Sequence, residues 1–153
     1  MLSNLVLKER LRSRRKLFGA WISFDHPSIA ELFAMGGFDF VSIDMEHAPI
    51  SLESAQSLFS RVQSQNVPCL PRPVSHSNDI FKPLLDSGAD GLIVQMVNTK
   101  KDVDNIIKCL KYPPIGNRTY GVNRAHGYGI NFNQYTQEWN NKSSLIVQIE
   151  SKE

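Results

Sequence analysis

Short apolar runs alternate along the chain with longer segments in which apolar side chains recur at helical spacing. The runs have the length of strands and are apolar throughout, which is typical of strands buried on both faces of a parallel sheet. Helices between them would supply the crossover connections, so the alternation predicts an α/β fold. The predicted strands are residues 17–22, 38–43, 67–70, 92–97 and 145–149, and the predicted helices are residues 29–35, 51–62, 79–85, 99–110 and 135–139.

Polar residues mark where several of these helices begin. Ser28 and Ser51 precede helical segments and are predicted to be N-caps, and Thr99 and Asp102 have the spacing of a capping box. Residues 113–132 are rich in Gly and Asn and predict a long loop. Loops of that length in compact domains are usually functional or disordered.

Four of the predicted strands are followed at or just beyond their ends by a polar side chain. These residues are Asp44, Arg72, Gln95 and Glu150. In a β/α barrel the carboxyl ends of the strands form one rim, and active sites lie at that rim. We therefore expect two carboxylates, a guanidinium and an amide to meet there, close to His47. This combination favours an enzyme active site.

Asp44 and His47 lie three residues apart on a predicted tight turn. The Asp44 carboxylate could accept the imidazole N–H, which would fix the tautomer of His47 and raise the basicity of its other ring nitrogen. In the alternative, Asp44 caps the following segment and His47 is solvated on a surface turn. The spacing alone leaves both interpretations open.

Charge changes this picture only at the N-terminus. The chain has 17 Lys and Arg against 15 Asp and Glu, a formal net charge of +2, which is too small to indicate a nucleic acid or an anionic membrane as a partner of the whole chain. The basic residues of segment 8–16 are interleaved with leucines, which predicts that residues 1–16 form a short basic helix or arm with a solvated basic face. A targeting peptide or a phosphate-binding arm is the alternative for this segment.

Two further patterns bear on the cellular setting. No apolar run approaches the ~20 residues that a membrane span needs, and no signal-peptide core follows Met1. We therefore expect a soluble, cytoplasmic protein. Cys69 and Cys109 lie far apart and support neither a disulfide framework nor a zinc site. Both are expected to be buried thiols.

Six motifs in one order resemble the HpcH/HpaI aldolase family. They are Gly19-x-Trp21, Gly37-Phe38-Asp39 leading to Asp44-x-Glu46-His47-Ala48-Pro49, Pro71-Arg72-Pro73, Tyr112-Pro113-Pro114-x-Gly116-x-Arg118, Arg124-Ala125-x-Gly127-Tyr128-Gly129 and Gln148-Ile149-Glu150. The resemblance implies a class II, metal-dependent pyruvate aldolase, similar to 2,4-dihydroxyhept-2-ene-1,7-dioate aldolase and 2-keto-3-deoxy sugar acid aldolases. It also implies a (β/α)8 TIM barrel. Since such a barrel needs about 250 residues, we expect residues 17–153 to be a C-terminally incomplete, aldolase-like domain holding the N-terminal portion, about five of the eight units.

The same resemblance assigns roles to individual residues. It makes His47 the catalytic acid/base and Asp44 its orienting partner, and it makes Arg72 the group that binds pyruvate and its enolate. Gln148 would bind substrate beside the metal, and Glu150 would be the first metal carboxylate. The second metal carboxylate would come from a strand after Glu150, outside these 153 residues.

The resemblance further implies a divalent cation (Mg, Mn, Co or Zn), a 2-oxo acid substrate made from pyruvate and an aldehyde, and a homo-oligomer. Other polar and aromatic residues receive weaker expectations. We expect Trp21 in the barrel core, Glu46 in a supporting or surface position, and His26, His76 and His126 in structural or solvated positions. His126 is the best candidate among these histidines for a loop contact near the substrate.

A second hypothesis comes from a different functional class. A chain with about five of the eight units of a barrel would expose an open strand edge, which invites pairing with another chain. The alternative to an aldolase is therefore a catalytically inactive, truncated barrel that serves as a binding or assembly partner.

Overall fold

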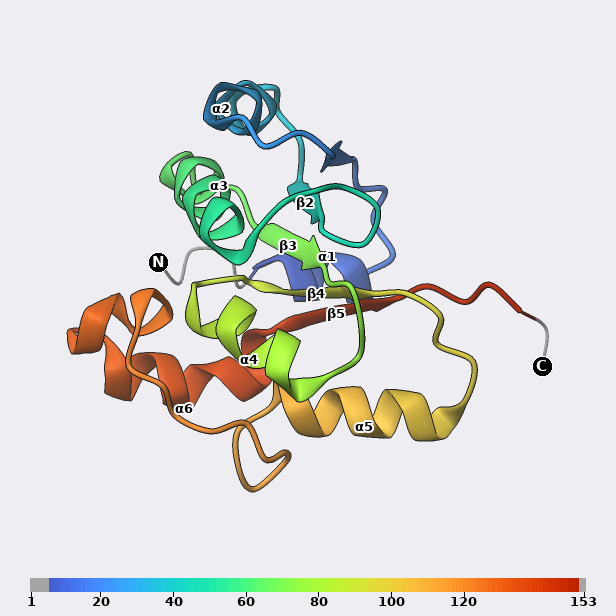
Figure 1. Cartoon of the computed structure of the whole chain (residues 1–153). Helices are drawn as coiled ribbons and strands as arrows, with labels where there is room; N and C mark the ends of the chain where they lie inside the picture. Colours follow the sequence, from blue (N-terminus) through green and yellow to red (C-terminus); the bar gives the residue numbers. More distant parts are fainter. Residues whose placement is uncertain (1–5, 152–153) are drawn as a thin grey trace.

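Parallel strands form the centre of the computed structural model, which describes residues 6–151 (Figure 1). Within these residues β1, β2 and β3 pair in one parallel sheet, and β4 pairs with β5 in a second. Two hydrogen bonds join the sheets, because the Asp90 amide donates to the Cys69 carbonyl (3.0 Å) and the Cys69 amide donates to Asp90 Oδ2 (2.9 Å). The strands therefore lie side by side in sequence order, and the predicted parallel α/β fold is confirmed. Their bounds are β1 Gly19–Ile22, β2 Phe40–Asp44, β3 Cys69–Arg72, β4 Gly91–Val94 and β5 Ser144–Val147.

Helices connect the strands, and α2 to α5 neighbour one another in the order in which they occur in the sequence (Figure 1). Ser51 caps α3 and Thr99 forms a capping box with Asp102 on α5, as predicted. The last predicted helix is longer than expected. The bounds are α1 Val6–Arg12, α2 Pro27–Met35, α3 Leu52–Ser64, α4 Asn78–Asp86, α5 Lys100–Leu110, the 3-10 helix η2 Arg124–Gly129, and α6 Phe132–Lys142.

The predicted cap of α2 is wrong by two residues. His26, not Ser28, is the N-cap, and its ring nitrogen Nδ1 accepts the Ser28 amide at 3.2 Å. Pro27 occupies the first helical position, where its fixed φ suits a helix and its missing N–H is not needed. His26 therefore has the structural role that was one of its two expected roles.

The strands have two faces with different partners. Val41 and Ile43 of β2 belong to the large hydrophobic core, which also contains buried residues of helices α2 to α6. On the opposite face, Leu7 of α1 packs against Leu70 and Ile93. We call these the helix face and the α1 face. Because successive side chains of a strand point to opposite faces, the α1 face is the one on which the side chains of Asp44 and Arg72 lie.

The long loop predicted at residues 113–132 is largely packed against the helices. Arg118 is fully buried and its Nη2 donates to Asp86 Oδ1 at 2.8 Å. His126 is also fully buried and lies 3.0 Å from the Tyr112 hydroxyl through its Nε2. This burial confirms the structural position expected for His126 and leaves none of its ring exposed for the substrate contact for which it was the best candidate among the three histidines.

Two other expectations concern cysteines and membranes. Cys69 is a buried free thiol, as predicted, whereas the free thiol of Cys109 is only half-buried. Among residues 6–151, no helix combines the length and the apolar character that crossing a bilayer requires.

Candidate active site at the strand ends

Asp44 and Arg72 form a bidentate ion pair across the ends of β2 and β3. The two residues are direct neighbours in the register of the parallel pair. Arg72 Nε donates to Asp44 Oδ1 at 3.1 Å, and Arg72 Nη2 donates to Asp44 Oδ2 at 2.8 Å. This geometry fixes the plane of the guanidinium and leaves its other N–H groups directed away from Asp44.

Asp44 accepts further hydrogen bonds from the turn that follows it. Its Oδ1 accepts the backbone amides of Glu46 (3.1 Å) and His47 (3.2 Å). Burial disfavours the charged form of Asp44, but the hydrogen bonds that it accepts outweigh burial and hold its pKa below the usual range. The carboxylate is therefore ionised at neutral pH, and it organises both Arg72 and the turn.

The predicted contact between Asp44 and the imidazole of His47 is wrong. Asp44 lies on the α1 face, where its oxygens are taken by Arg72 and by backbone amides, whereas the His47 side chain is 71% exposed. The carboxylate near the ring is Glu46, whose Oε2 lies 3.6 Å from His47 Nε2. The geometry is that of the alternative interpretation, in which Asp44 caps the turn and His47 faces solvent.

Glu46 and Trp21 complete the surroundings of Arg72. Glu46 Oε2 lies 3.1 Å from Arg72 Nη1, which is the supporting position expected for Glu46. The guanidinium lies over the Trp21 ring at 4.8 Å from its centroid, and the indole N–H donates to Asp44 at 3.4 Å. Trp21 is 41% exposed, so its expected place in the barrel core is wrong.

Four buried oxygen atoms on the α1 face or in the turn after β2 lack a hydrogen-bond partner within residues 6–151. They are Ser42 Oγ, Glu46 Oε2, Gln95 Oε1 and Gln148 Oε1, of which Glu46 Oε2 is in the ion pair with Arg72. Strand alternation places Ser42, Gln95 and Gln148 on the α1 face, together with Phe40, Ile93 and Ile146. Buried polar atoms are almost always hydrogen-bonded, so these atoms are candidates for contacts with water, an ion or a ligand.

Gln95 and Glu150 are also held by backbone contacts at the strand ends. The Gln95 carbonyl accepts from His76 Nε2 at 2.5 Å, which gives His76 a structural role. Glu150 Oε2 accepts the amide of Met96 at 3.3 Å. The charge of Glu150 is also among the causes that raise the pKa of Arg72, after the hydrogen bonds to Asp44. The structure thus brings Asp44, Arg72, Gln95 and Glu150 to one end of the strands, as predicted.

The oxygen ligands that residues 6–151 offer are of the kind that a divalent cation prefers, but they are too few to hold it alone. Glu150 supplies a carboxylate and Gln148 an unpartnered amide oxygen, and hard divalent cations take oxygen ligands. Within residues 6–151, however, no three His, Cys, Asp or Glu side chains are grouped to hold a metal. These residues could therefore hold part of a coordination shell, and substrate oxygens, water or other protein groups would supply the rest.

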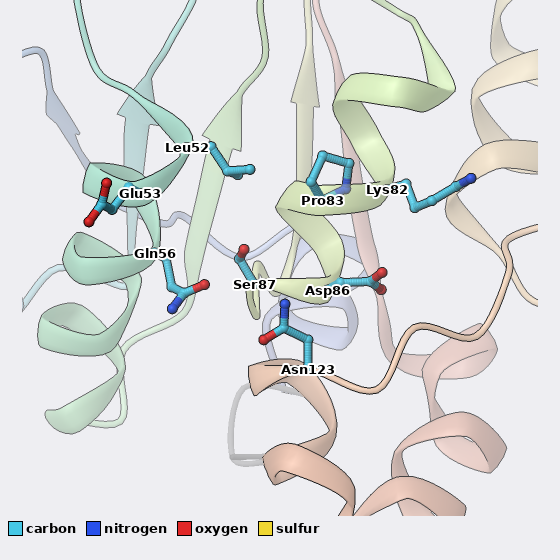
Figure 2. A pocket seen from close by; sticks show the side chains of 8 residues that line it. All are labelled: Leu52, Glu53, Gln56, Lys82, Pro83, Asp86, Ser87 and Asn123. Atoms are coloured by element: carbon cyan, nitrogen blue, oxygen red, sulfur yellow. The ribbon is translucent and has the colours of Figure 1, made fainter.

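A cavity lies elsewhere, between α3 and α4 on the outer side of the helix layer (Figure 2). It has a volume of about 460 Å³, and the side chains of Gln56, Lys82 and Asn123 are among those that line it. The residues predicted for the active site do not line this cavity. The strand-end site is thus defined by its polar groups and not by the size of a cavity.

Sequence reasoning missed the contributions of Trp21 and Ser42 to the site. A signal for both was present, because alternation from Asp44 and from Gly19 places Ser42 and Trp21 on the α1 face. The contact between Glu46 and Arg72 depends on the path of the turn, which no local pattern specifies.

The fold and the site define a class: a parallel α/β protein with an arginine and the carboxylates of Asp44, Glu46 and Glu150 at the carboxyl ends of its strands. The family model for HpcH/HpaI aldolase/citrate lyase matches residues 17–153, and the chain belongs to that family. The resemblance inferred from the six motifs is therefore confirmed.

Similarity to individual relatives supports the same family membership. The chain is 35% identical over 154 residues to the 2-keto-3-deoxy-L-rhamnonate aldolase of Escherichia coli strain K12, covering 99% of this chain and 57% of that protein. An HpcH/HpaI aldolase/citrate lyase family protein from Burkholderia cenocepacia superimposes with a TM-score of 0.87 at 32% identity, covering 95% of this chain and 60% of that one. For the HpcH/HpaI aldolase from Desulfitobacterium hafniense the TM-score is 0.84 at 25% identity, covering 95% and 57%. The chain thus spans little more than half the length of the relatives that it matches.

Proposed function

We propose that this chain forms the N-terminal portion of a (β/α)8 barrel and carries one side of the active site of a class II pyruvate aldolase. The reaction would make or cleave the C–C bond between a pyruvate enolate and an aldehyde in a 4-hydroxy-2-oxo acid. Membership of the family and the name of the E. coli relative support this class of reaction. The observation that carries the proposal is the ion pair between Asp44 and Arg72 at the strand ends.

Arg72 is the proposed binding group for the pyruvate unit. A guanidinium has five N–H groups, and Asp44 takes one from Nε and one from Nη2. Of the other three, on Nη1 and Nη2, one on Nη1 faces Glu46 Oε2 at 3.1 Å, and the two that are left would bind oxygens of a carboxylate or of an enolate. Because Asp44, Glu46 and Trp21 fix the guanidinium, little reorganisation is needed as negative charge develops on the substrate.

His47 is the proposed acid/base. Its exposed ring can reach a substrate hydroxyl, from which it would take a proton during cleavage and to which it would return one during synthesis. Asp44 would act on His47 through the backbone, because it accepts the His47 amide and so holds the turn.

Glu150, with Gln148 beside it, is the proposed protein contribution to a divalent cation site. When bound, a cation such as Mg, Mn, Co or Zn would supply Lewis-acid stabilisation of the enolate. The unpartnered oxygens of Gln148 and Gln95 support a ligand at this place. Gln148 would orient the 2-oxo acid by hydrogen bonding from its amide N–H group.

The test is exchange of the pyruvate methyl protons with deuterated solvent, followed by NMR with Mg²⁺ or with a chelator. It reports enolate formation without knowledge of the aldehyde. We expect exchange that needs the cation, and a loss of about 10² to 10³-fold in Arg72→Met. Arg61→Met, an exposed arginine on α3, is the matched control and should exchange like the original chain.

The exchange experiment also separates the two functional hypotheses. Absence of exchange in the folded chain at saturating Mg²⁺ would contradict the proposal for these 153 residues and favour the catalytically inactive binding partner. Exchange that is equal in Arg72→Met and Arg61→Met would contradict the role of Arg72 alone.

A further inference from the structure

A second cavity, of about 340 Å³, lies between α1, α5 and the start of β5. Lys8 and Arg12 of α1 line it together with Lys111, which follows α5, and with Ser143 and Ser144. Among the described residues, the others that line it are aliphatic, and none of the lining residues is a carboxylate. We call this cavity, defined by Lys8, Arg12, Lys111, Ser143 and Ser144, the basic pocket.

The basic pocket gives a structural setting to part of the basic N-terminal segment. Lys8 and Arg12 are four residues apart, so they lie on the same face of α1. Leu7 fixes α1 by packing against Leu70 and Ile93. Two of the N-terminal cations therefore line a cavity, and Arg12 is also exposed to solvent.

Lys111 is the buried cation of the pocket. The residue is 8% exposed, and its Nζ donates to the Asn140 carbonyl at 2.8 Å and to Ser143 Oγ at 2.5 Å. Lys8 Nζ donates to the Asn141 carbonyl at 2.9 Å. These carbonyls belong to the C-terminal end of α6, whose dipole offsets part of the positive charge.

Some hydrogen-bond donors and some positive charge of the basic pocket are not used in these contacts. Within residues 6–151 the guanidinium of Arg12 forms no hydrogen bond or ion pair, and the Ser144 hydroxyl forms no hydrogen bond. Burial, together with the charges of Lys8 and Arg12, lowers the pKa of Lys111 to about 7. The cations therefore repel one another, and an anion between them would remove that repulsion.

We propose that the basic pocket binds a phosphate group, either free or as the end of a small phosphate ester. Three cations at one cavity without a carboxylate match an anion of more than one charge, and a phosphate monoester carries about −1.5 to −2 near pH 7. The planar fork of Arg12 suits two phosphate oxygens, and Lys8 and Lys111 act as point charges. The aliphatic walls leave room for a short organic group.

The test is calorimetric titration of the whole chain at pH 7.5 and fixed ionic strength, with inorganic phosphate in one arm and glycerol phosphate in the other. We expect Arg12→Gln to weaken binding about tenfold or more, the loss of a charged hydrogen-bonded contact. Arg15→Gln removes the same charge from an exposed position of the same segment outside the pocket and should bind like the original chain. Tighter binding of the ester would identify a metabolite as the ligand, and tighter or equal binding of inorganic phosphate would identify the free anion.

Proton uptake gives a second measurement in the same titrations. Because an anion beside Lys111 raises its pKa from about 7, binding at pH 7.5 takes up protons, and the heat depends on the ionisation enthalpy of the buffer. Absence of binding in both arms would overturn the proposal. Equal weakening by Arg12→Gln and Arg15→Gln would overturn it too, and so would binding that is lost in Arg72→Met but kept in Arg12→Gln.

Discussion

The chain contains two arginine–aspartate pairs with the same contact distance and different surroundings. In Arg72–Asp44 and in Arg118–Asp86, a terminal guanidinium nitrogen lies 2.8 Å from a carboxylate oxygen. The Arg118 side chain is 0% exposed, whereas that of Arg72 is 12% exposed at the strand ends. The ion pair itself therefore does not distinguish the two sites.

Their other contacts do distinguish them. The rings of Tyr112 and Trp139 lie 4.6 and 4.7 Å from the Arg118 guanidinium, so aromatic residues enclose it. Within residues 6–151, Asp86 accepts its side-chain hydrogen bond from Arg118 alone.

Asp44, by contrast, also accepts two backbone amides and the indole N–H of Trp21. Asp44 therefore keeps other hydrogen-bond donors when Arg72 binds a ligand. Asp86, within residues 6–151, would lose its donor if Arg118 bound one.

The largest expected effect is on stability, in Arg118→Met. The substitution leaves Asp86 buried and without its donor, which should lower the free energy of unfolding by about 3–5 kcal/mol. Chemical denaturation of the variant measures the loss, with Arg61→Met as a control at an exposed arginine. A loss no greater than the control's would show that the aromatic cage does not depend on the pair.

A smaller effect is expected in Trp21→Leu, which removes the ring beneath Arg72 and a donor to Asp44. Loss of a cation–π contact of about 1 kcal/mol should weaken pyruvate binding about fivefold. Titration of the methyl-exchange rate with pyruvate gives the half-saturating concentration. Phe24→Leu, at an aromatic residue that is 69% exposed, should leave it unchanged, and equal shifts in both variants would contradict a specific role for Trp21.

The third expected effect is a pH dependence of stability that arises away from both pairs. The pKa of Lys111 is about 7 in the folded chain against an ordinary value of 10.5, so between these values the unfolded chain binds more protons. Stability from this group therefore rises as pH increases from about 7 towards 10. Thermal unfolding at pH 7, 8 and 9 should show the rise in the original chain and a flatter profile in Lys111→Met. Parallel pH profiles in the original chain and in Lys111→Met would contradict the assignment of this pH dependence to Lys111.

Much of the site could be predicted from the sequence, because it depends on the alternation of strands and helices and on the polar residues at the strand ends. Strand and helix alternation predicted the parallel fold, and the polar residues after the strands predicted that Asp44, Arg72 and Glu150 would lie together. The sequence did not predict which residue Asp44 contacts, since a local turn suggested His47 and the register of β2 against β3 selected Arg72.

The cage around Arg118 could not be predicted for a related reason. Its walls come from Tyr112, Tyr135 and Trp139, which are brought together only when the long loop folds over the helices. Trp21 was misplaced because a large aromatic residue in an apolar strand usually lies in a core. Here it covers a guanidinium instead.

The most direct test of Arg72 as the pyruvate-binding group is the affinity of the chain for pyruvate with and without Arg72, measured by calorimetry in the presence of Mg²⁺. We predict that Arg72→Met binds pyruvate about tenfold or more weakly and loses only about 1 kcal/mol of unfolding free energy, because Asp44 keeps its other donors. Unchanged affinity in a folded Arg72→Met variant would contradict it. Arg72 would then hold the strand ends together as Arg118 holds the helices.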